Sequence, residues 1–187
     1  MKIGVISDTH GNVSAWQKAI KLLGDVDLIL HAGDVLYHPP RLSPGEGYDI
    51  PELARLINKC PIPVIIARGN CDAEVYQELL EIPTLSPYAF VYFAEKAIVM
   101  SHGHALTNER MAEIASRYGA DIIITGHTHI PVVERIGRAI HINPGSATHS
   151  KLERDGVPIA TVGLICDGLV QVLDLETGEE VSALVTG

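Results

Sequence analysis

Five short apolar runs in this sequence each end abruptly in a cluster of Gly, Asp, Asn or His. They begin at residues 5, 30, 67, 98 and 124 and read VISDTH, LHAGD, ARGN, IVMSHGH and ITGHTH. A short apolar run bounded by turn residues is typical of a buried strand. In α/β proteins the carboxyl ends of the strands line the ligand crevice. The pattern therefore predicts an α/β fold that gathers these polar side chains at one place.

Helical and strand patterns alternate over the first two thirds of the chain, and strands follow. Strands are predicted at residues 2–7, 27–32, 63–67, 89–93, 96–101 and 121–125, and helices at 13–23, 51–58 and 107–118. Asn12 is expected to cap the first helix, and the Pro- and Gly-rich residues 36–48 form a long loop. Residues 131–185 predict four or five strands. We expect an α/β core with a mixed sheet, a second sheet packed on it, and a single domain over residues 1–187.

Composition excludes several classes of protein. No apolar run approaches the roughly 18 residues of a membrane span, and Asp8 comes too early for a signal peptide. Three cysteines without paired spacing predict no disulfide framework and a cytoplasmic protein. With 14 Lys and Arg against 23 Asp and Glu, the net charge of −9 argues against extended nucleic acid as a partner.

The residue types at the strand ends select the chemistry. The candidate ligands are Asp8, His10, Asp34, Asn70, His102, His127 and His129. A single Asp or His after a strand is more often a turn residue, but five such ends together favour a site. This mixed nitrogen and oxygen set suits Mn, Fe, Zn or related ions, and seven ligands are too many for one tetrahedral zinc. If Asp34 bridges, the bonds divide into two groups of four, and two metals about 3.5–4 Å apart are the usual clamp for phosphoester hydrolysis.

Further motifs complete the pattern. They are Gly33-Asp34-Val35-Leu36, Arg68-Gly69-Asn70-Cys71-Asp72, His102-Gly103-His104, Gly126-x-x-His129 and Asn143-Pro144-Gly145-Ser146. Together with Asp8-x-His10, their order resembles the calcineurin-like metallophosphoesterase superfamily, and more closely its YfcE-type phosphodiesterase branch. The resemblance covers residues 1–175.

The resemblance implies a four-layer α-β-β-α sandwich with two divalent transition-metal ions, manganese first and zinc, nickel, cobalt or iron as alternatives. It assigns one ion to Asp8, His10, Asp34 and His129, and the other to Asp34, Asn70, His102 and His127. It also implies that a metal-bridging hydroxide attacks a small phosphodiester in line.

One position departs from the wider superfamily, where a His after Gly-Asn helps to protonate the leaving oxygen. Here that position is Cys71, which the YfcE-type branch shares. A neutral thiol is a poor acid, so the identity of the general acid stays open and leaving groups that depart easily are favoured. The residues expected to act in catalysis are Asp34, Asn70, Cys71 and His104, and those expected to contact substrate are Asn12, Asn70 and His104.

Other residues have structural interpretations. The role of Asp72 stays open, with a structural cap as the alternative to a functional role, and His31 is interpreted as a hydrogen-bonded core residue. The segment around Asn143 is expected to support the site.

Two alternatives to a phosphodiesterase remain open at this point. One is a protein-interaction scaffold on the same fold, like the retromer subunit, although that lineage lacks the histidine that this chain has as His10. The other is a phosphomonoesterase. A small phosphodiester, no membrane, and self-association through the 36–50 loop are the remaining expectations about partners.

Overall fold

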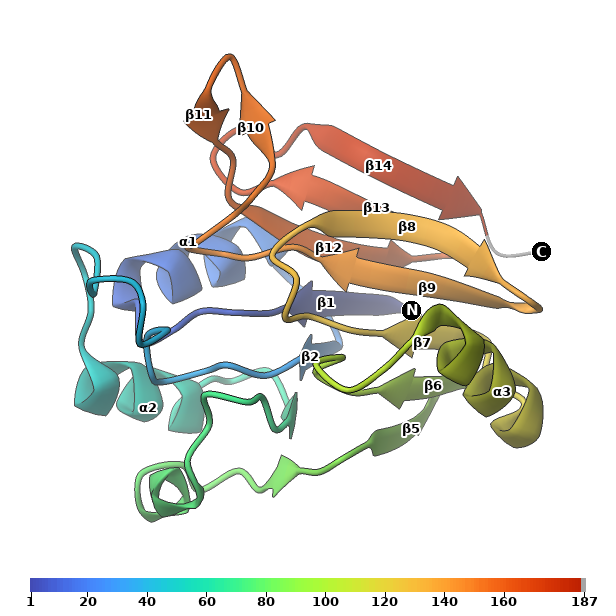
Figure 1. Ribbon diagram of the computed structural model, residues 1–187, viewed down its shortest axis with the longest axis horizontal. Coiled ribbons are helices and arrows are strands. Elements are labelled where there is room, and N and C mark those ends of the chain that lie inside the picture. Colours follow the sequence, from blue (N-terminus) through green and yellow to red (C-terminus); the bar gives the residue numbers. More distant parts are fainter. Residues whose placement is uncertain (186–187) are drawn as a thin grey trace.

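Two β-sheets packed face to face form the centre of the computed structural model, which describes residues 1–185 (Figure 1). The larger sheet has the order β14-β13-β12-β1-β2-β3-β4. Its strands are β1 (Lys2–Ile6), β2 (Leu28–His31), β3 (Val64–Ala67), β4 (Thr84–Leu85), β12 (Thr161–Cys166), β13 (Leu169–Asp174) and β14 (Glu180–Val185). Strands β1 to β4 are parallel to one another, whereas β12 to β14 are antiparallel, so the sheet is mixed as predicted.

The smaller sheet has the order β5-β6-β7-β9-β8. Its strands are β5 (Ala89–Phe93), β6 (Lys96–Met100), β7 (Ile122–Ile124), β8 (Pro131–Ile136) and β9 (Ala139–Pro144). The predicted hairpin of β5 and β6 is confirmed, and its turn residues Ala94 and Glu95 both have positive φ, as a tight hairpin requires. Strands β6, β7 and β9 run parallel, so their carboxyl ends lie at one edge.

Helices cover the outer faces of both sheets. Helices α1 (Val13–Leu23) and α2 (Ile50–Asn58) cover the larger sheet, and α3 (Asn108–Tyr118) covers the smaller one on the opposite side of the molecule (Figure 1). The layers therefore follow the order α-β-β-α, which confirms the predicted sandwich. Among residues 1–185, no helix has the length and apolar character needed to cross a membrane.

Side-chain caps set where the helices begin. The Asn12 side chain accepts a hydrogen bond from the Ala15 backbone N–H at 2.9 Å, and Asp49 and Thr107 cap α2 and α3 in the same way. These bonds satisfy amide groups that have no partner within the first turn. The predicted cap at Asn12 is confirmed.

The central strands are apolar throughout because both of their faces are buried. On β1, Ile3 and Val5 face the other sheet, whereas Ile6 faces the layer of α1 and α2. A strand covered on both faces shows a continuous apolar run instead of an alternating pattern. This burial explains why the short runs in the sequence were informative.

The structure contains short elements that the sequence analysis did not anticipate. They are β4, the 3-10 helix η1 (Glu74–Glu78), and a hairpin of β10 (Glu153–Arg154) and β11 (Val157–Pro158). Five longer strands from β8 onward match the expected four or five, and the extra hairpin raises the count after residue 131 to seven. Two-residue strands are too short to show any periodicity. The 36–48 segment is a loop without helix or strand, as predicted.

The packing between the sheets predicts a large cost for removing a central side chain. Ile122 is fully buried in that layer, so Ile122→Ala is expected to lower the free energy of unfolding by about 2–5 kcal/mol and Ile122→Val by about 0.5–1.5 kcal/mol. Urea unfolding measures both. The exposed Val157→Ala on the small hairpin is the control, and an Ile122→Ala effect no larger than that control would contradict this packing.

Candidate metal centre

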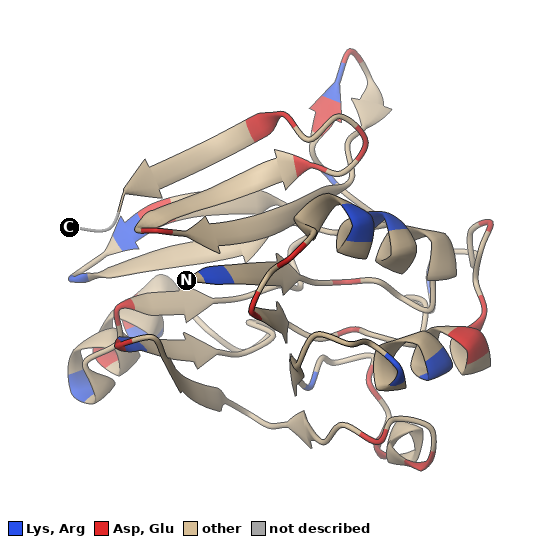
Figure 2. Ribbon diagram, turned by 180° about the vertical axis from the view of Figure 1, so that it is seen from behind, with Lys and Arg blue, Asp and Glu red and all other residues tan. Residues whose placement is uncertain are grey.

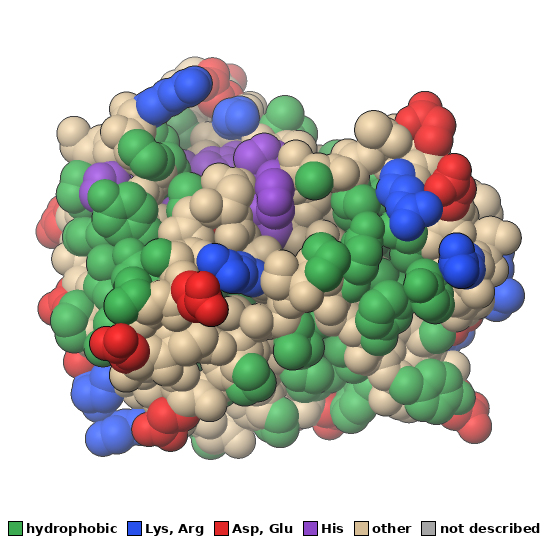
Figure 3. Space-filling model, turned by 60° about the horizontal axis from the view of Figure 1, so that its bottom comes forward, with side chains coloured by type: hydrophobic (Ala, Val, Ile, Leu, Met, Phe, Trp, Pro, Cys, Tyr) green, Lys and Arg blue, Asp and Glu red, His purple; other side chains and the backbone are tan. Residues whose placement is uncertain are grey.

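Loops at the carboxyl ends of five strands supply all the candidate ligands. The loop after β1 carries Asp8 and His10, β2 is followed by Asp34, β3 by Asn70 and Cys71, β6 by His102 and His104, and β7 by His127 and His129. Both sheets contribute because their parallel strands end at the same side of the molecule. Figure 3 shows histidine side chains reaching the surface together, with hydrophobic side chains on either side.

Five of the seven candidate ligands have a left-handed backbone conformation. Their φ angles lie between 43° and 67°, at Asp8, His10, Asp34, His127 and His129. Such a conformation at a residue other than glycine costs on the order of 1–3 kcal/mol and persists where surrounding contacts hold it. The other four such residues in the described chain lie in hairpin turns, at Ala94, Glu95, Asp155 and Asp167. Among the described residues other than glycine, a left-handed backbone outside hairpin turns therefore occurs only in this cluster.

Two glycines of the motifs lie so close to neighbouring atoms that no other residue fits there. A Cβ at Gly69 would collide with the carboxylate and backbone nitrogen of Asp34. A Cβ at Gly126 would collide with the Ser7 hydroxyl, which donates a hydrogen bond to Asp8. Any larger residue at these positions would push the carboxylates out of place.

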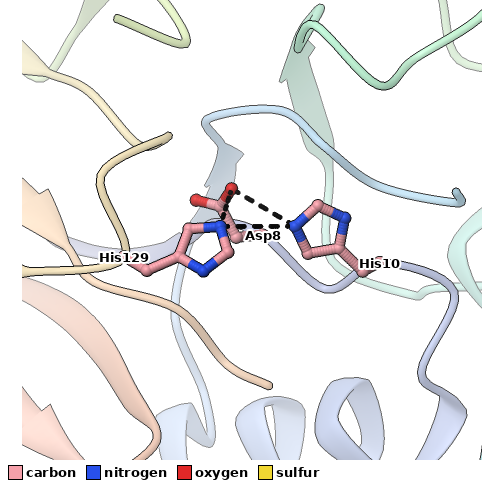
Figure 4. Close-up of side chains that lie close together, drawn as sticks. All are labelled: Asp8, His10 and His129. Carbon is pink, nitrogen blue, oxygen red and sulfur yellow. Dashed lines mark hydrogen bonds and ion pairs between the residues drawn. The ribbon is translucent and has the colours of Figure 1, made fainter. Parts of the chain in front are cut away.

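Asp8, His10 and His129 form the first group of ligand atoms (Figure 4). The Asp8 Oδ1 atom lies 3.1 Å from His129 Nε2 and 3.6 Å from His10 Nε2. The two histidine nitrogens are 3.4 Å apart. Three donor atoms thus point at one small space.

Asp34, Asn70 and His102 form a second group beside the first. The Asp34 Oδ2 atom lies 3.3 Å from His102 Nε2 and 3.9 Å from His10 Nε2, which belongs to the first group. The Asn70 Oδ1 atom lies 3.1 Å from the same His102 nitrogen. One oxygen of Asp34 therefore faces both groups, as a bridging ligand would.

His127 and His104 lie at the open side of the second group. Both side chains are exposed, and the His127 ring centroid is 5.2 Å from that of His102 and 6.0 Å from that of His104. The backbone N–H of His127 also donates to Asp8 Oδ2 at 3.0 Å, which ties β7 to β1.

Backbone carbonyls orient three of the histidines. The Nδ1 atoms of His10, His102 and His129 lie 2.6, 2.8 and 2.7 Å from the carbonyl oxygens of Tyr37, Ala32 and His149. A carbonyl can only accept, so each Nδ1 carries a hydrogen and each Nε2 faces inward, where it donates to a carboxylate when the ring is protonated and offers a lone pair when the ring is neutral. Such a partner behind the ring is the usual arrangement for a metal-ligating histidine.

The buried carboxylates and histidines of this centre suit divalent cations. The buried Asp8 Oδ1 has no hydrogen-bond partner among the described residues, and the Nε2 atoms of His10 and His129 face it. Burial opposes charge on Asp8, but His10 and His129 hold the pKa of its carboxyl far below its usual range. Burial likewise opposes charge on His102, but Asp34 and Asp8 raise its pKa to about 9. The pocket thus attracts positive charge, and its mixed donors fit transition-metal ions.

A shell of polar residues holds the ligand loops. The Asp72 carboxylate accepts hydrogen bonds at 2.8 Å from the backbone N–H groups of Asp34, Val35 and Gly69. It joins the loops after β2 and β3, so of the two alternatives for Asp72 these bonds support the structural cap. Ser146 and Thr148 donate to the Asp8 carbonyl at 3.0 and 2.9 Å.

On the other sheet, Asn143 donates to the Gly126 carbonyl at 2.7 Å. The expected support from the segment around Asn143 is therefore present. Sequence reasoning missed Tyr37, Ala32 and His149 as partners, because they act through backbone carbonyls that carry no side-chain signal.

The remaining candidates have these positions. Burial and the nearby Asp34 carboxylate raise the pKa of the Cys71 thiol to about 12, so it stays neutral at physiological pH. The Asn12 side chain accepts a hydrogen bond from the Ala15 backbone N–H at the start of α1 and donates one to the Glu46 carbonyl at 2.8 Å. The substrate contacts expected of Asn12, Asn70 and His104, and the ligand roles themselves, stay predictions.

Comparison with known proteins gives consistent matches. The profile of the Calcineurin-like phosphoesterase superfamily domain matches residues 1–165. The chain is 33% identical over 177 residues to the phosphodiesterase YfcE of Escherichia coli, which covers 94% of this chain and 92% of that protein. It is 29% identical over 154 residues to a phosphodiesterase of Methanocaldococcus jannaschii, covering 78% and 83% of the two chains.

Solved structures show the same fold. The E. coli Yfce phosphoesterase matches with a TM-score of 0.84 and 29% identity, over 100% of both chains. Vps29 of Entamoeba histolytica, solved in complex with Zn²⁺, matches with a TM-score of 0.65 and 22% identity, again over 100% of both chains. At that lower identity the likeness concerns the fold alone.

His31 lies directly behind the centre and is fully buried. Its Nδ1 accepts a hydrogen bond from the Gly33 backbone N–H at 3.2 Å, so Nε2 carries the hydrogen and lies 3.1 Å from Thr9 Oγ1. Burial lowers its pKa to about 3. The interpretation of His31 as a hydrogen-bonded core residue is confirmed.

This neutral histidine predicts a pH-dependent stability. Below its ordinary pKa of 6.5 the unfolded chain takes up a proton at His31, whereas the folded chain does so only near pH 3. The free energy of unfolding therefore falls as the pH falls through this window, by about 1.4 kcal/mol per pH unit for one proton. Urea unfolding of His31→Gln is expected to show a slope smaller by that amount. The exposed His104→Gln is the control, and an unchanged slope in His31→Gln would contradict the assignment.

Proposed function

This chain belongs to the calcineurin-like phosphoesterase superfamily and is a phosphodiester hydrolase, and we propose that it cleaves small phosphodiesters with two divalent ions held in the candidate metal centre. The observation that carries the proposal is the position of Asp34. One of its oxygens lies 3.3 Å from a nitrogen of the second ligand group and 3.9 Å from one of the first. A shared carboxylate between two sets of donors is what a pair of neighbouring ions needs.

The proposed ligands divide as the resemblance to the superfamily implies. One ion would be held by Asp8, His10, Asp34 and His129, and the other by Asp34, Asn70, His102 and His127. Two bound divalent ions lower the pKa of a shared water and neutralise charge on the phosphate. Manganese is the first ion to test, and zinc, nickel, cobalt and iron are alternatives, because imidazole and carboxylate donors accept all of them.

The chain's own residues would position the substrate around that pair. Asn70 and His104 lie beside His102 and would donate hydrogen bonds to phosphate oxygens, and Asn12, on the loop that carries His10, would also contact the substrate. We name no residue as the general acid that protonates the leaving oxygen. Because the Cys71 thiol is neutral and a weak acid, good leaving groups are expected to react fastest.

The charge distribution favours a small substrate. Figure 2 shows Lys and Arg spread over helices and strand ends among Asp and Glu, without gathering on one face of the drawn chain. The formal net charge is −9, so the positive potential for a phosphate would come from the bound ions and act over a short range. A long polyanion would meet repulsion outside the centre. A cytoplasmic location and self-association through the 36–50 loop stay predictions.

Substituting the shared carboxylate tests the centre. Asp34→Asn is expected to lower kcat/KM for bis(4-nitrophenyl) phosphate by at least about 100-fold, since loss even of outer partners of metal ligands costs about 10–100-fold. The metal content, measured by inductively coupled plasma mass spectrometry, is expected to fall below two ions per chain.

Asp25→Asn is the matched control, because the Asp25 side chain is 91% exposed and, among the described residues, forms an ion pair with Lys2 alone. Its activity and metal content should equal those of the wild type. The proposal fails if the wild-type protein loaded with Mn, Zn, Ni or Co shows no turnover of the diester.

A neutral thiol at residue 71 predicts a small effect on an activated substrate. Cys71→Ala is expected to change kcat for bis(4-nitrophenyl) phosphate by less than about tenfold, because nitrophenolate departs without a proton. General acids contribute at least about 100-fold. A loss of that size in steady-state assays would contradict this prediction and show that Cys71 contributes to the reaction in another way than by protonating the leaving group.

A further inference from the structure

A cavity of about 460 Å³ opens next to the candidate metal centre. It is lined by Tyr37, Pro40, Asn70, Cys71, Ala73 and Tyr76. None of these six residues is Lys, Arg, Asp, Glu or His, although the neighbouring centre is densely charged. We call this cavity the aryl pocket.

The floor of the aryl pocket is continuous with the metal centre. Asn70 contributes to the pocket lining and places its Oδ1 atom 3.1 Å from His102 Nε2. The Cys71 sulfur lies within 4.8 Å of a ligand atom of both His10 and Asp34. A group attached to a phosphate in the centre would therefore reach the pocket across Asn70 and Cys71.

Two aromatic side chains from separate loops form its walls. Tyr37 follows β2, and its carbonyl oxygen accepts the hydrogen bond from His10 Nδ1 at 2.6 Å. The Tyr37 ring lies 4.6 Å from the ring of His38, which in turn contacts Tyr48 at 5.2 Å. Tyr37 thus lines the pocket with its ring and orients the candidate ligand His10 with its carbonyl group.

Tyr76 also lines the pocket and follows β3. It lies in the 3-10 helix η1, where its backbone N–H donates to Ala73 and its carbonyl accepts from Leu79 and Leu80. Its ring is half-buried and packs against the cluster under α1 and α2. The Tyr76 ring is therefore held by packing before any ligand binds, which lowers the entropic cost of binding, whereas Tyr37 is 38% exposed.

We propose that the aryl pocket binds an uncharged, planar aromatic ester group of the substrate, and that Tyr37 and Tyr76 determine this specificity. The inference rests on the proposed function, because it places the phosphate in the metal centre. Aromatic rings gain from stacked or edge-to-face contact beyond simple burial. A charged ester group would find no counterion on these walls, and a phosphomonoester without a second ester group would leave part of the site empty.

Two diesters, each with a poorer leaving group than nitrophenolate, test the inference through their affinity instead of their turnover. Isothermal titration calorimetry on the manganese-loaded protein compares diphenyl phosphate with dimethyl phosphate, which share the anionic phosphodiester and differ only in the ester groups. Diphenyl phosphate is expected to bind at least about tenfold more tightly, a difference that corresponds to about 1.4 kcal/mol.

Variants of one wall then locate the preference. Tyr76→Ala is expected to reduce the ratio of the two dissociation constants at least about fivefold, and Tyr76→Phe is expected to retain it because the ring remains. Tyr92→Ala is the matched control, since Tyr92 lies on β5 and is 76% exposed. Circular dichroism confirms that each variant is folded.

The outcomes separate the two proposals. Equal binding of the two diesters by wild-type protein, or the same ratio in Tyr76→Ala as in Tyr92→Ala, would overturn the aryl pocket. If that happens while bis(4-nitrophenyl) phosphate is hydrolysed, the proposed function stands alone. If neither diester binds and no hydrolysis occurs with any of the ions, the proposed function has failed and the aryl pocket with it.

Discussion

The structure depends on two buried carboxylates, Asp8 and Asp34, at the meeting point of its two sheets. Burying a charge without a partner is costly, so each carboxylate needs compensation on every side. One oxygen of each accepts backbone N–H bonds, from His127 for Asp8 and from Cys71 for Asp34. The other oxygen of each faces histidine nitrogens. Positive charge at this point, as protons or as divalent ions, is what makes the arrangement electrostatically favourable.

The surrounding chain supports that electrostatic arrangement at a conformational cost. Five of the candidate ligands adopt left-handed backbone conformations, and glycines beside them allow contacts that a Cβ would block. Asp72 and Ser146 hold the strained loops with hydrogen bonds to the backbone. The apolar layer between the sheets supplies the stability that offsets this strain. Next to the charged centre, the aryl pocket is lined by aromatic and uncharged residues.

Much of the fold could be predicted from the sequence because its central elements repeat a clear physical signal. Buried parallel strands show apolar runs, and caps such as Asn12 and Thr107 mark the helices. The two-residue strands β4, β10 and β11 were missed because they are too short to show a period. The ligand types could be predicted because each follows a strand. Their partners Tyr37 and Ala32 could not, since they act through carbonyl groups that every residue has.

The sequence by itself determined the chemical class of the site: carboxylates, imidazoles and an amide at the ends of five strands, in an order that resembles one superfamily. Only the tertiary structure decided how these side chains are grouped, which nitrogen of His10 or His102 faces inward, and that one oxygen of Asp34 faces both groups. It also brought Tyr37 and Tyr76 together as walls of one pocket. The reason is physical: residue types follow from local order along the chain, whereas distances and orientations follow from the packing of two sheets whose strands are remote in sequence.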